Sequence, residues 1–179
     1  MSAIADSAPH RRYRIIGLWL FALAAMVFVM VIIGGLTRLT NSGLSMVEWR
    51  PITGWLPPLS DAAWEETFRA YQATPEYRHV NAGMSVAEFK GIFWLEYIHR
   101  LWGRIIGFAF FVPFLFFIAR GWLDRALAPR LALIFVLGGL QGALGWYMVA
   151  SGLVDRPEVS QYRLVAHFGA ALVIYVALL

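Results

Sequence analysis

The sequence predicts an all-α membrane protein, a four-transmembrane-helix bundle with a cytoplasmic N-terminus. Three observations lead to this fold class. Hydrophobic residues make up 60% of the 179 residues and the mean hydropathy is +0.63, whereas soluble domains are about 45 to 50% apolar. Four apolar segments reach or approach the length that crosses a bilayer. Arginines gather in alternate connections between these segments, as in multi-pass membrane proteins.

The first elements are a short cytoplasmic leader over residues 1–14 and an apolar span over residues 15–36. A helix of this span measures about 33 Å, which matches the roughly 30 Å hydrocarbon layer. We interpret the span as an uncleaved anchor, because the apolar run continues well past a weak cleavage-like sequence ending at Ala24. The leader is too brief for a mitochondrial transit peptide, which favours a bacterial plasma membrane.

Residues 37–90 form a predicted external loop that carries a short amphipathic helix. Ser60 is a favourable N-cap residue, and Trp64, Phe68 and Tyr71 follow at the spacing of one apolar helix face. We expect such a helix to lie on the membrane surface or to roof a cavity.

The second span covers residues 91–119, and its helix is expected to begin outside the bilayer. The sequence from Ser85 to Glu88 has the form of a capping box, which places the helix start near Ser85. A helix from there to the end of the span is longer than the bilayer is thick. Glu96 and His99 therefore fall near the external boundary rather than at the midplane.

The remaining elements are a cytoplasmic loop over residues 120–130, a third span over 131–150, an external loop over 151–163 and a fourth span over 164–179. The fourth span stops at Leu179 with no flanking polar residue and is shorter than the roughly 17 residues that cross a bilayer. We therefore expect the chain to be the front part of a longer protein.

The distribution of charge supports this orientation and argues against a nucleic-acid partner. The net charge is +4, but the basic residues do not form the single patch that nucleic acids require. They gather before the first span and between the second and third spans, at Arg11, Arg12, Arg14, Arg120, Arg125 and Arg130. By the positive-inside rule, both segments are cytoplasmic. The chain has no cysteine, which excludes disulfides and thiolate ligands.

A weak internal repeat relates the two halves of the chain. Ser42-Gly43-Leu44 follows the first span and Ser151-Gly152-Leu153 follows the third, and each precedes a span with a histidine in its outer half. This pattern indicates two copies of a helix pair. In that arrangement, an approximate twofold axis brings His99 and His167 to face each other at the same depth.

These two histidines, His99 and His167, are the candidate metal ligands. Ionisable groups in apolar spans are costly and usually mark a site. Two facing imidazoles at equal depth are the ligand set of a six-coordinate haem iron in a helix bundle. Gly103, one turn after His99, leaves room for a flat macrocycle. Arg38 and Arg163, near the external ends of their spans, are candidate partners of the haem propionates.

Two further polar residues of the spans have several possible roles. Glu96 can orient the His99 imidazole, pair with Arg100 at i+4, or accept a proton from a reacting substrate. Gln141 can bind a neighbouring helix or the substrate. The other two histidines, His10 and His79, lie in polar surroundings and are interpreted as solvated surface residues.

A set of short motifs occurs in a fixed order along nearly the whole chain. They are Gly34-Gly35-Leu36-Thr37-Arg38-Leu39-Thr40, Ser42-Gly43-Leu44-Ser45, Trp49-Arg50-Pro51 with Gly54 and Pro57-Pro58, Glu96-Tyr97-Ile98-His99-Arg100 with Trp102-Gly103-Arg104, Leu140-Gln141-Gly142 with Gly145-Trp146 and Met148-Val149, and Val165-Ala166-His167. Jointly, these motifs resemble those of the heme A synthase family, of the type found in alphaproteobacteria and related to the mitochondrial enzyme.

The resemblance implies an eight-helix pseudo-symmetric membrane protein built from two similar four-helix halves, each with a histidine pair. It implies that the amino-terminal half holds the substrate haem and the missing carboxy-terminal half a haem b cofactor. The family oxidises a ring methyl of heme O to a formyl group, giving heme A for cytochrome c oxidase. By position, Glu96 matches the family's functional glutamate, while His99 and His167 match the first histidine pair. Some members carry a cysteine pair in the external loop, which this chain lacks.

The resulting hypothesis is a membrane oxidoreductase of the bacterial inner membrane, with Glu96 as the catalytic residue and the haem site near the external side. The expected partners are heme O and the lipid bilayer, and the candidate protein partners are heme O synthase, cytochrome c oxidase assembly factors and a second copy of the chain. The main alternative is a membrane cytochrome b that transfers electrons through a bis-histidine haem. A second alternative is a non-haem membrane subunit, such as a transporter.

Overall fold

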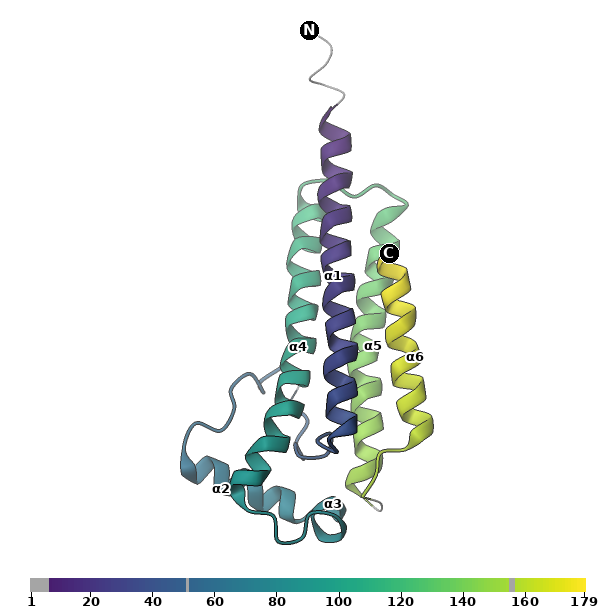
Figure 1. Cartoon of the computed structure of the whole chain (residues 1–179). Coiled ribbons are helices and arrows are strands. Elements are labelled where there is room, and N and C mark those ends of the chain that lie inside the picture. The colour runs from purple at the N-terminus through teal and green to yellow at the C-terminus, as the bar shows by residue number, and fades with distance from the viewer. Residues whose placement is uncertain (1–6, 51, 155–156) are drawn as a thin grey trace.

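A computed structural model describes residues 7–50, 52–154 and 157–179 of the chain, and within them it contains six helices and no strand. Four long helices run side by side as a bundle (Figure 1): α1 (Ser7–Leu39), α4 (Val86–Ala119), α5 (Leu127–Leu153) and α6 (Gln161–Leu178). All four are long and apolar enough to cross a membrane. The predicted all-α four-helix fold class is therefore confirmed.

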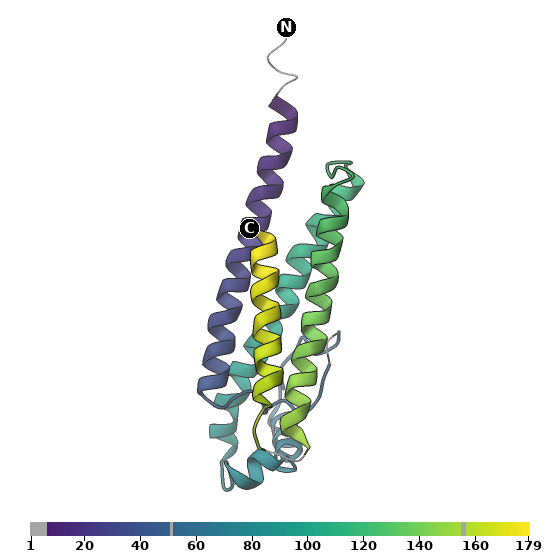
Figure 2. The ribbon, with the colours of Figure 1, turned by 90° about the vertical axis from the view of Figure 1, so that its right-hand side faces the viewer.

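The four long helices form a ring in which each helix has two neighbours. Helix α1 packs against α4 and α6, and α5 packs against the same two helices. Helices α4 and α6, which carry the two histidines, consequently stand diagonally across the bundle. Figures 1 and 2 show the start of α1 and the α4–α5 connection at one end of the bundle. The opposite end carries two short helices, α2 (Asp61–Gln72) and α3 (Pro75–His79), and is called the α2 end below.

The long helices extend beyond the apolar spans. Residues 7–14, assigned to the leader by the sequence, form the first turns of α1, and both α5 and α6 begin earlier than the spans at 131 and 164. Hydropathy marks only the part of a helix that suits lipid, whereas the backbone hydrogen-bond ladder continues into polar turns. Residues 1–6 of the leader, Pro51 and residues 155–156 of the second loop lie outside the described residues.

The start of α4 is fixed by the predicted capping box. The Ser85 Oγ accepts a hydrogen bond from the Glu88 N–H at 3.3 Å, and the Glu88 carboxylate accepts one from the Ser85 N–H at 2.8 Å. Both bonds give an acceptor to a backbone N–H group that has no partner within the helix. The prediction that this helix begins near Ser85 is confirmed.

A proline inside α4 is compensated by a tryptophan of α1. Pro113 has no N–H, so the Ala109 carbonyl, four residues earlier, loses its usual helical donor. The Trp19 indole Nε1 donates to that carbonyl at 2.8 Å. Because water is absent from a bilayer core, such a replacement leaves no unsatisfied backbone carbonyl at the proline and joins α1 to α4.

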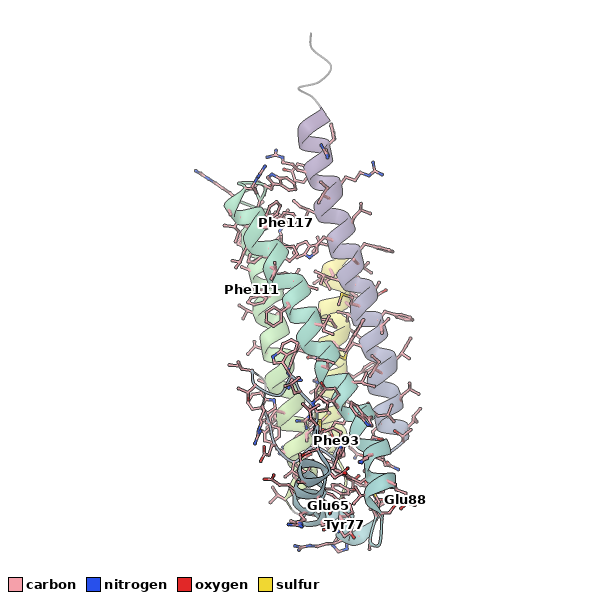
Figure 3. The ribbon with its side chains drawn as sticks, turned by 90° about the vertical axis from the view of Figure 1, so that its left-hand side faces the viewer. Glu65, Tyr77, Glu88, Phe93, Phe111 and Phe117 are labelled. Atoms are coloured by element: carbon pink, nitrogen blue, oxygen red, sulfur yellow. The ribbon has the colours of Figure 1, made fainter. Side chains whose placement is uncertain are left out.

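The apolar core of the bundle lies on the side away from the α2 end, towards the region of Phe111 and Phe117 in Figure 3. It contains residues from all four long helices: Leu23, Ala24, Val27, Phe110, Phe114, Leu131, Ile134, Ile174 and Leu178. This packing fixes the four helix axes, and the polar side chains described below lie nearer the other end.

The first connection folds onto the protruding turns of α4. Ser60 caps α2 by accepting a hydrogen bond from the Ala63 N–H at 3.2 Å, which confirms the predicted short helix. Its apolar face packs against an aromatic row of α4, in a cluster formed by Trp64, Phe68, Tyr71, Phe89, Phe93 and Tyr97. Figure 3 labels Glu65 of α2 and Phe93 of α4, both of which lie towards this end of the bundle. The sequence did not predict α3, a single short helix capped by Thr74.

Candidate functional site

The two predicted iron ligands lie on opposite helices of the bundle and interact across it. His99 is on α4 and His167 is on α6, and the two half-buried imidazoles are close enough for their charges to interact. The internal repeat predicts that the two rings face each other at the same depth. An iron shared by two side chains requires rings that face a common space.

Each imidazole rests against a glycine of the preceding long helix. A Cβ placed on Gly34 of α1 would lie 3.3 Å from His99 Nε2, and one placed on Gly145 of α5 would lie 2.9 Å from His167 Cε1. A larger residue at Gly145 would collide with the ring. Helix–helix contacts therefore restrict the orientation of both imidazoles.

Polar atoms around His167 are only partly satisfied. The Gln141 Nε2 donates to the His167 carbonyl at 2.8 Å, so Gln141 binds the neighbouring helix. The His167 Nδ1 and the Gln141 Oε1 are buried and have no hydrogen-bond partner among the described residues. Leaving such an atom unsatisfied costs about 1–3 kcal/mol, which a bound ligand or water can recover.

The donor set fits a macrocyclic iron better than a bare metal ion. Among the described residues, no group of three or more His, Cys, Asp or Glu side chains could hold a metal ion. Protein sites for a bare zinc ion use at least three protein ligands. A haem iron is already held by its macrocycle and takes its axial ligands from the protein, so one imidazole on each side is a complete set.

Glu96 is buried in a network that fastens the loop after α1 to α4. One carboxylate oxygen pairs with Arg100, as the i+4 spacing predicted. The other accepts hydrogen bonds from the Ser45 Oγ at 2.7 Å and from the Met46 N–H at 2.8 Å. Arg100 also donates to the carbonyls of Met46 and Glu48, each at 2.9 Å. Both oxygens of Glu96 are thus engaged, and its negative charge is fixed one turn before His99.

The two candidate propionate partners lie at the α2 end with contacts of their own. Arg38, exposed at the end of α1, donates to the Asn41 Oδ1 at 3.3 Å. Arg163, in the first turn of α6, donates to the Tyr147 carbonyl at 2.7 Å and lies over the Tyr147 ring at 3.8 Å. Both guanidinium groups lie at the α2 end, and each would have to exchange a neutral partner in order to bind a carboxylate.

Gly103 lies against a flexible side chain of α1. A Cβ on Gly103 would lie 3.2 Å from the Met30 Cε of α1, so the missing side chain makes room for Met30. A macrocycle on His99 therefore requires this flexible side chain to turn away.

Comparisons with known proteins identify the family of the chain. Residues 17–179 match the family model described as cytochrome oxidase assembly protein. The chain belongs to this family. It is 60% identical over 163 residues to the heme A synthase of Nitrosospira multiformis, a match that covers 91% of this chain and 46% of the relative. The heme A synthases of Bradyrhizobium diazoefficiens (60% over 169 residues, 94% and 47% covered) and Parvibaculum lavamentivorans (59% over 161 residues, 90% and 47%) are similarly close.

The resemblance inferred from the motifs is thereby confirmed. The chain spans about half the length of the curated relatives it matches. No solved structure matches it significantly.

In this member of the cytochrome oxidase assembly protein family, the structure adds site residues to which sequence reasoning assigned no role. Trp49 of the first loop stacks on Trp146 of α5, with ring centroids 5.5 Å apart and an interplanar angle of 9°. Leu44 of the same loop packs on Gly152, where an added Cβ would meet Leu44 Cδ1 at 2.7 Å. Trp49, Leu44 and Trp146 belong to the quoted motifs, but their contacts join segments about a hundred residues apart, which no local pattern reveals.

Proposed function

We propose that this chain is the substrate-haem-binding half of a heme A synthase. The relatives that bear this name share about 60% of its residues over nearly its whole length. The observation that carries the proposal is the pair of imidazoles on diagonal helices, each seated against a glycine. The reaction proposed for the whole protein oxidises a ring methyl of heme O to the formyl group of heme A, for use in cytochrome c oxidase.

In this proposal His99 and His167 hold the iron of the substrate haem, while Arg38 and Arg163 anchor its propionates. Gly103 provides clearance once Met30 turns away, and the buried Gln141 carbonyl is a polar contact for the substrate. Glu96 is the proposed catalytic residue. Its fixed negative charge stabilises positive charge that develops near the ring methyl, or its carboxylate accepts a proton as that methyl is oxidised.

The proposed setting is the bacterial inner membrane, with the α2 end on the external side. This orientation follows from the arginines at the other end of the bundle, in the first turns of α1 and in and beside the α4–α5 connection. The proposed partners are heme O and the surrounding lipid, together with heme O synthase, cytochrome c oxidase assembly factors and a second copy of the chain. A haem b cofactor belongs to the carboxy-terminal half that the longer relatives carry.

The identity of the co-purified pigment tests the proposal. We expect the purified chain to yield heme O or heme A when its haem is extracted and separated by chromatography. Haem b alone would contradict the synthase and favour the electron-transferring cytochrome b. Purified protein with no Soret absorption after haem addition would contradict both and favour a non-haem subunit.

Replacing the proposed catalytic residue tests its role. Glu96→Gln retains a carbonyl acceptor for the loop but removes the negative charge, so we expect haem binding to persist and formyl formation to stop. The measurement is the heme A content of membranes that contain the variant, with the exposed Glu66→Gln as the matched control. Heme A formation by Glu96→Gln at the unmodified rate would show that the carboxylate has no catalytic role.

A further inference from the structure

We propose that residues 42–49, called the strap below, tie α4 to α5 across the α2 end and thereby set the spacing of the two imidazoles. The inference rests on the proposed function, because it assigns the strap a positioning role in the same haem site. The strap follows directly on α1, the helix whose Gly34 supports His99.

The attachment of the strap to α4 is polar and buried. Ser45, which is 1% exposed, donates to Glu96, and the Met46 N–H donates to the same carboxylate oxygen. Arg100 donates hydrogen bonds to two strap carbonyls, those of Met46 and Glu48. Charge-assisted hydrogen bonds of this kind are stronger than neutral ones, particularly where water is excluded.

The attachment of the strap to α5 is apolar. Leu44, which is 3% exposed, presses on the backbone of Gly152, and the Trp49 ring lies flat on Trp146. Offset or parallel aromatic pairs at this separation contribute beyond their buried area. The strap thus contacts α5 at two places, Trp146 and Gly152.

Both attachments lie beside the histidine contacts. Glu96 is one turn before His99 on α4, and Trp146 directly follows Gly145, the glycine that supports the His167 ring. A functional site must be held to within about 0.5 Å of its working geometry. Because α4 and α6 stand diagonally, the spacing of the two rings depends on how α5 is held relative to α4, and the strap joins these two helices directly.

The test removes the aromatic attachment and keeps the polar one. Trp49→Ala is compared with Trp94→Ala, because both tryptophans lie near the α2 end and are similarly exposed, at 44% and 40%. Trp49→Phe retains a ring for stacking and serves as the rescue variant. All variants are studied as the full chain in lipid nanodiscs.

The first readout needs no haem. The chain has no cysteine, so Ile98→Cys and Ala143→Cys on the exposed faces of α4 and α5 introduce two unique spin-label sites. We expect the distance distribution from pulsed electron paramagnetic resonance to broaden or shift in Trp49→Ala and to be unchanged in Trp94→Ala and Trp49→Phe. An unchanged distance distribution in Trp49→Ala would overturn the proposal that the strap ties α4 to α5.

The second readout uses iron protoporphyrin IX as the probe. We expect Trp49→Ala to weaken binding about three- to tenfold and to convert part of the six-coordinate low-spin signal to a five-coordinate high-spin one. Equal binding and spin state in Trp49→Ala and Trp94→Ala would overturn the positioning role. Failure of the unmodified chain to bind the probe through two imidazoles would instead refute the proposed function, while the label distances would still decide whether the strap holds α4 and α5.

Discussion

The histidines illustrate what a single residue reveals in a sequence and what it conceals. The sequence singles out His99 and His167 because ionisable side chains are rare in apolar spans, and their role as ligands stays a prediction. The contacts of Gly34 and Gly145 with these rings could not be predicted, because glycine occurs throughout the chain and these two lie on neighbouring helices. The same limit applies to Glu96, whose pairing with Arg100 is local and was anticipated, but whose bonds to Ser45 and Met46 are not local.

The contact between Gly145 and His167 leads to a graded prediction. Gly145→Ala places a methyl group 2.9 Å from the ring, whereas Gly34→Ala places one 3.3 Å from His99. We expect haem titrations monitored at the Soret band to show a loss of affinity of about five- to 150-fold for Gly145→Ala, since overpacking of this kind costs about 1–3 kcal/mol, and a smaller loss for Gly34→Ala. Gly138→Ala, which points into open space, should bind as the unmodified chain does. Equal haem affinities for the Gly138 and Gly145 variants would show that the contact between Gly145 and the His167 ring does not affect haem binding.

The buried carboxyl group of Glu76, in α3, leads to a prediction about how stability depends on pH. Burial raises the pKa of Glu76 from 4.5 to about 7, although the hydrogen bond from the Tyr71 hydroxyl at 3.1 Å opposes the rise. Between these two values the folded state binds more protons than the unfolded state, so stability falls as pH rises from about 4.5 to 7 and then levels off. The whole change amounts to about 3 kcal/mol.

Glu76→Gln keeps an acceptor for Tyr71 and cannot ionise. We expect this variant to lose the pH dependence and to be more stable than the unmodified chain above pH 7, as measured by thermal unfolding across a pH series. The exposed Glu65→Gln on α2 is the control and should retain the original slope. A slope in Glu76→Gln equal to that of the control would show that another group titrates.

Whole elements were predicted where one face or one cap determines them. The Ser85 capping box and the apolar face of α2 gave the correct helix start and the correct short helix. Helix ends such as Ser7 and Leu127 were missed, because polar turns continue the backbone ladder beyond the apolar span. Helix α3 was missed because a five-residue helix has no periodicity to detect.

The bond between α1 and α4 at the proline can be tested by a double-mutant cycle. Trp19→Phe leaves the Ala109 carbonyl without its donor, so we expect a loss of about 1–3 kcal/mol in unfolding free energy. In the Pro113→Ala background the helix regains an N–H at position 113, and the same Trp19→Phe substitution should then cost less. The unfolding free energies of all four proteins are measured in mixed detergent micelles. An identical cost in both backgrounds would show that packing, rather than the hydrogen bond, joins the helices.

For the whole molecule, the internal repeat was more informative than its short sequence implied. Helix α1 pairs with α4 and α5 pairs with α6, so each repeat copy is one helix pair. The two Ser-Gly-Leu motifs also meet, through Leu44 of the first and Gly152 of the second. The sequence predicted the pairing because the same order of a span, a Ser-Gly-Leu motif and a histidine-bearing span occurs twice. It could not predict the contact between the motifs, which depends on how the two pairs dock.

The length of α4 connects the short helix α2 to the candidate site. One unbroken helix joins the turns that α2 covers to the turn that carries His99. The outward face of α2 presents Glu65, Glu66 and Arg69 to solvent. By linkage, an antibody fragment that binds those side chains would change the setting of His99 only if it favoured one position of α2 over another.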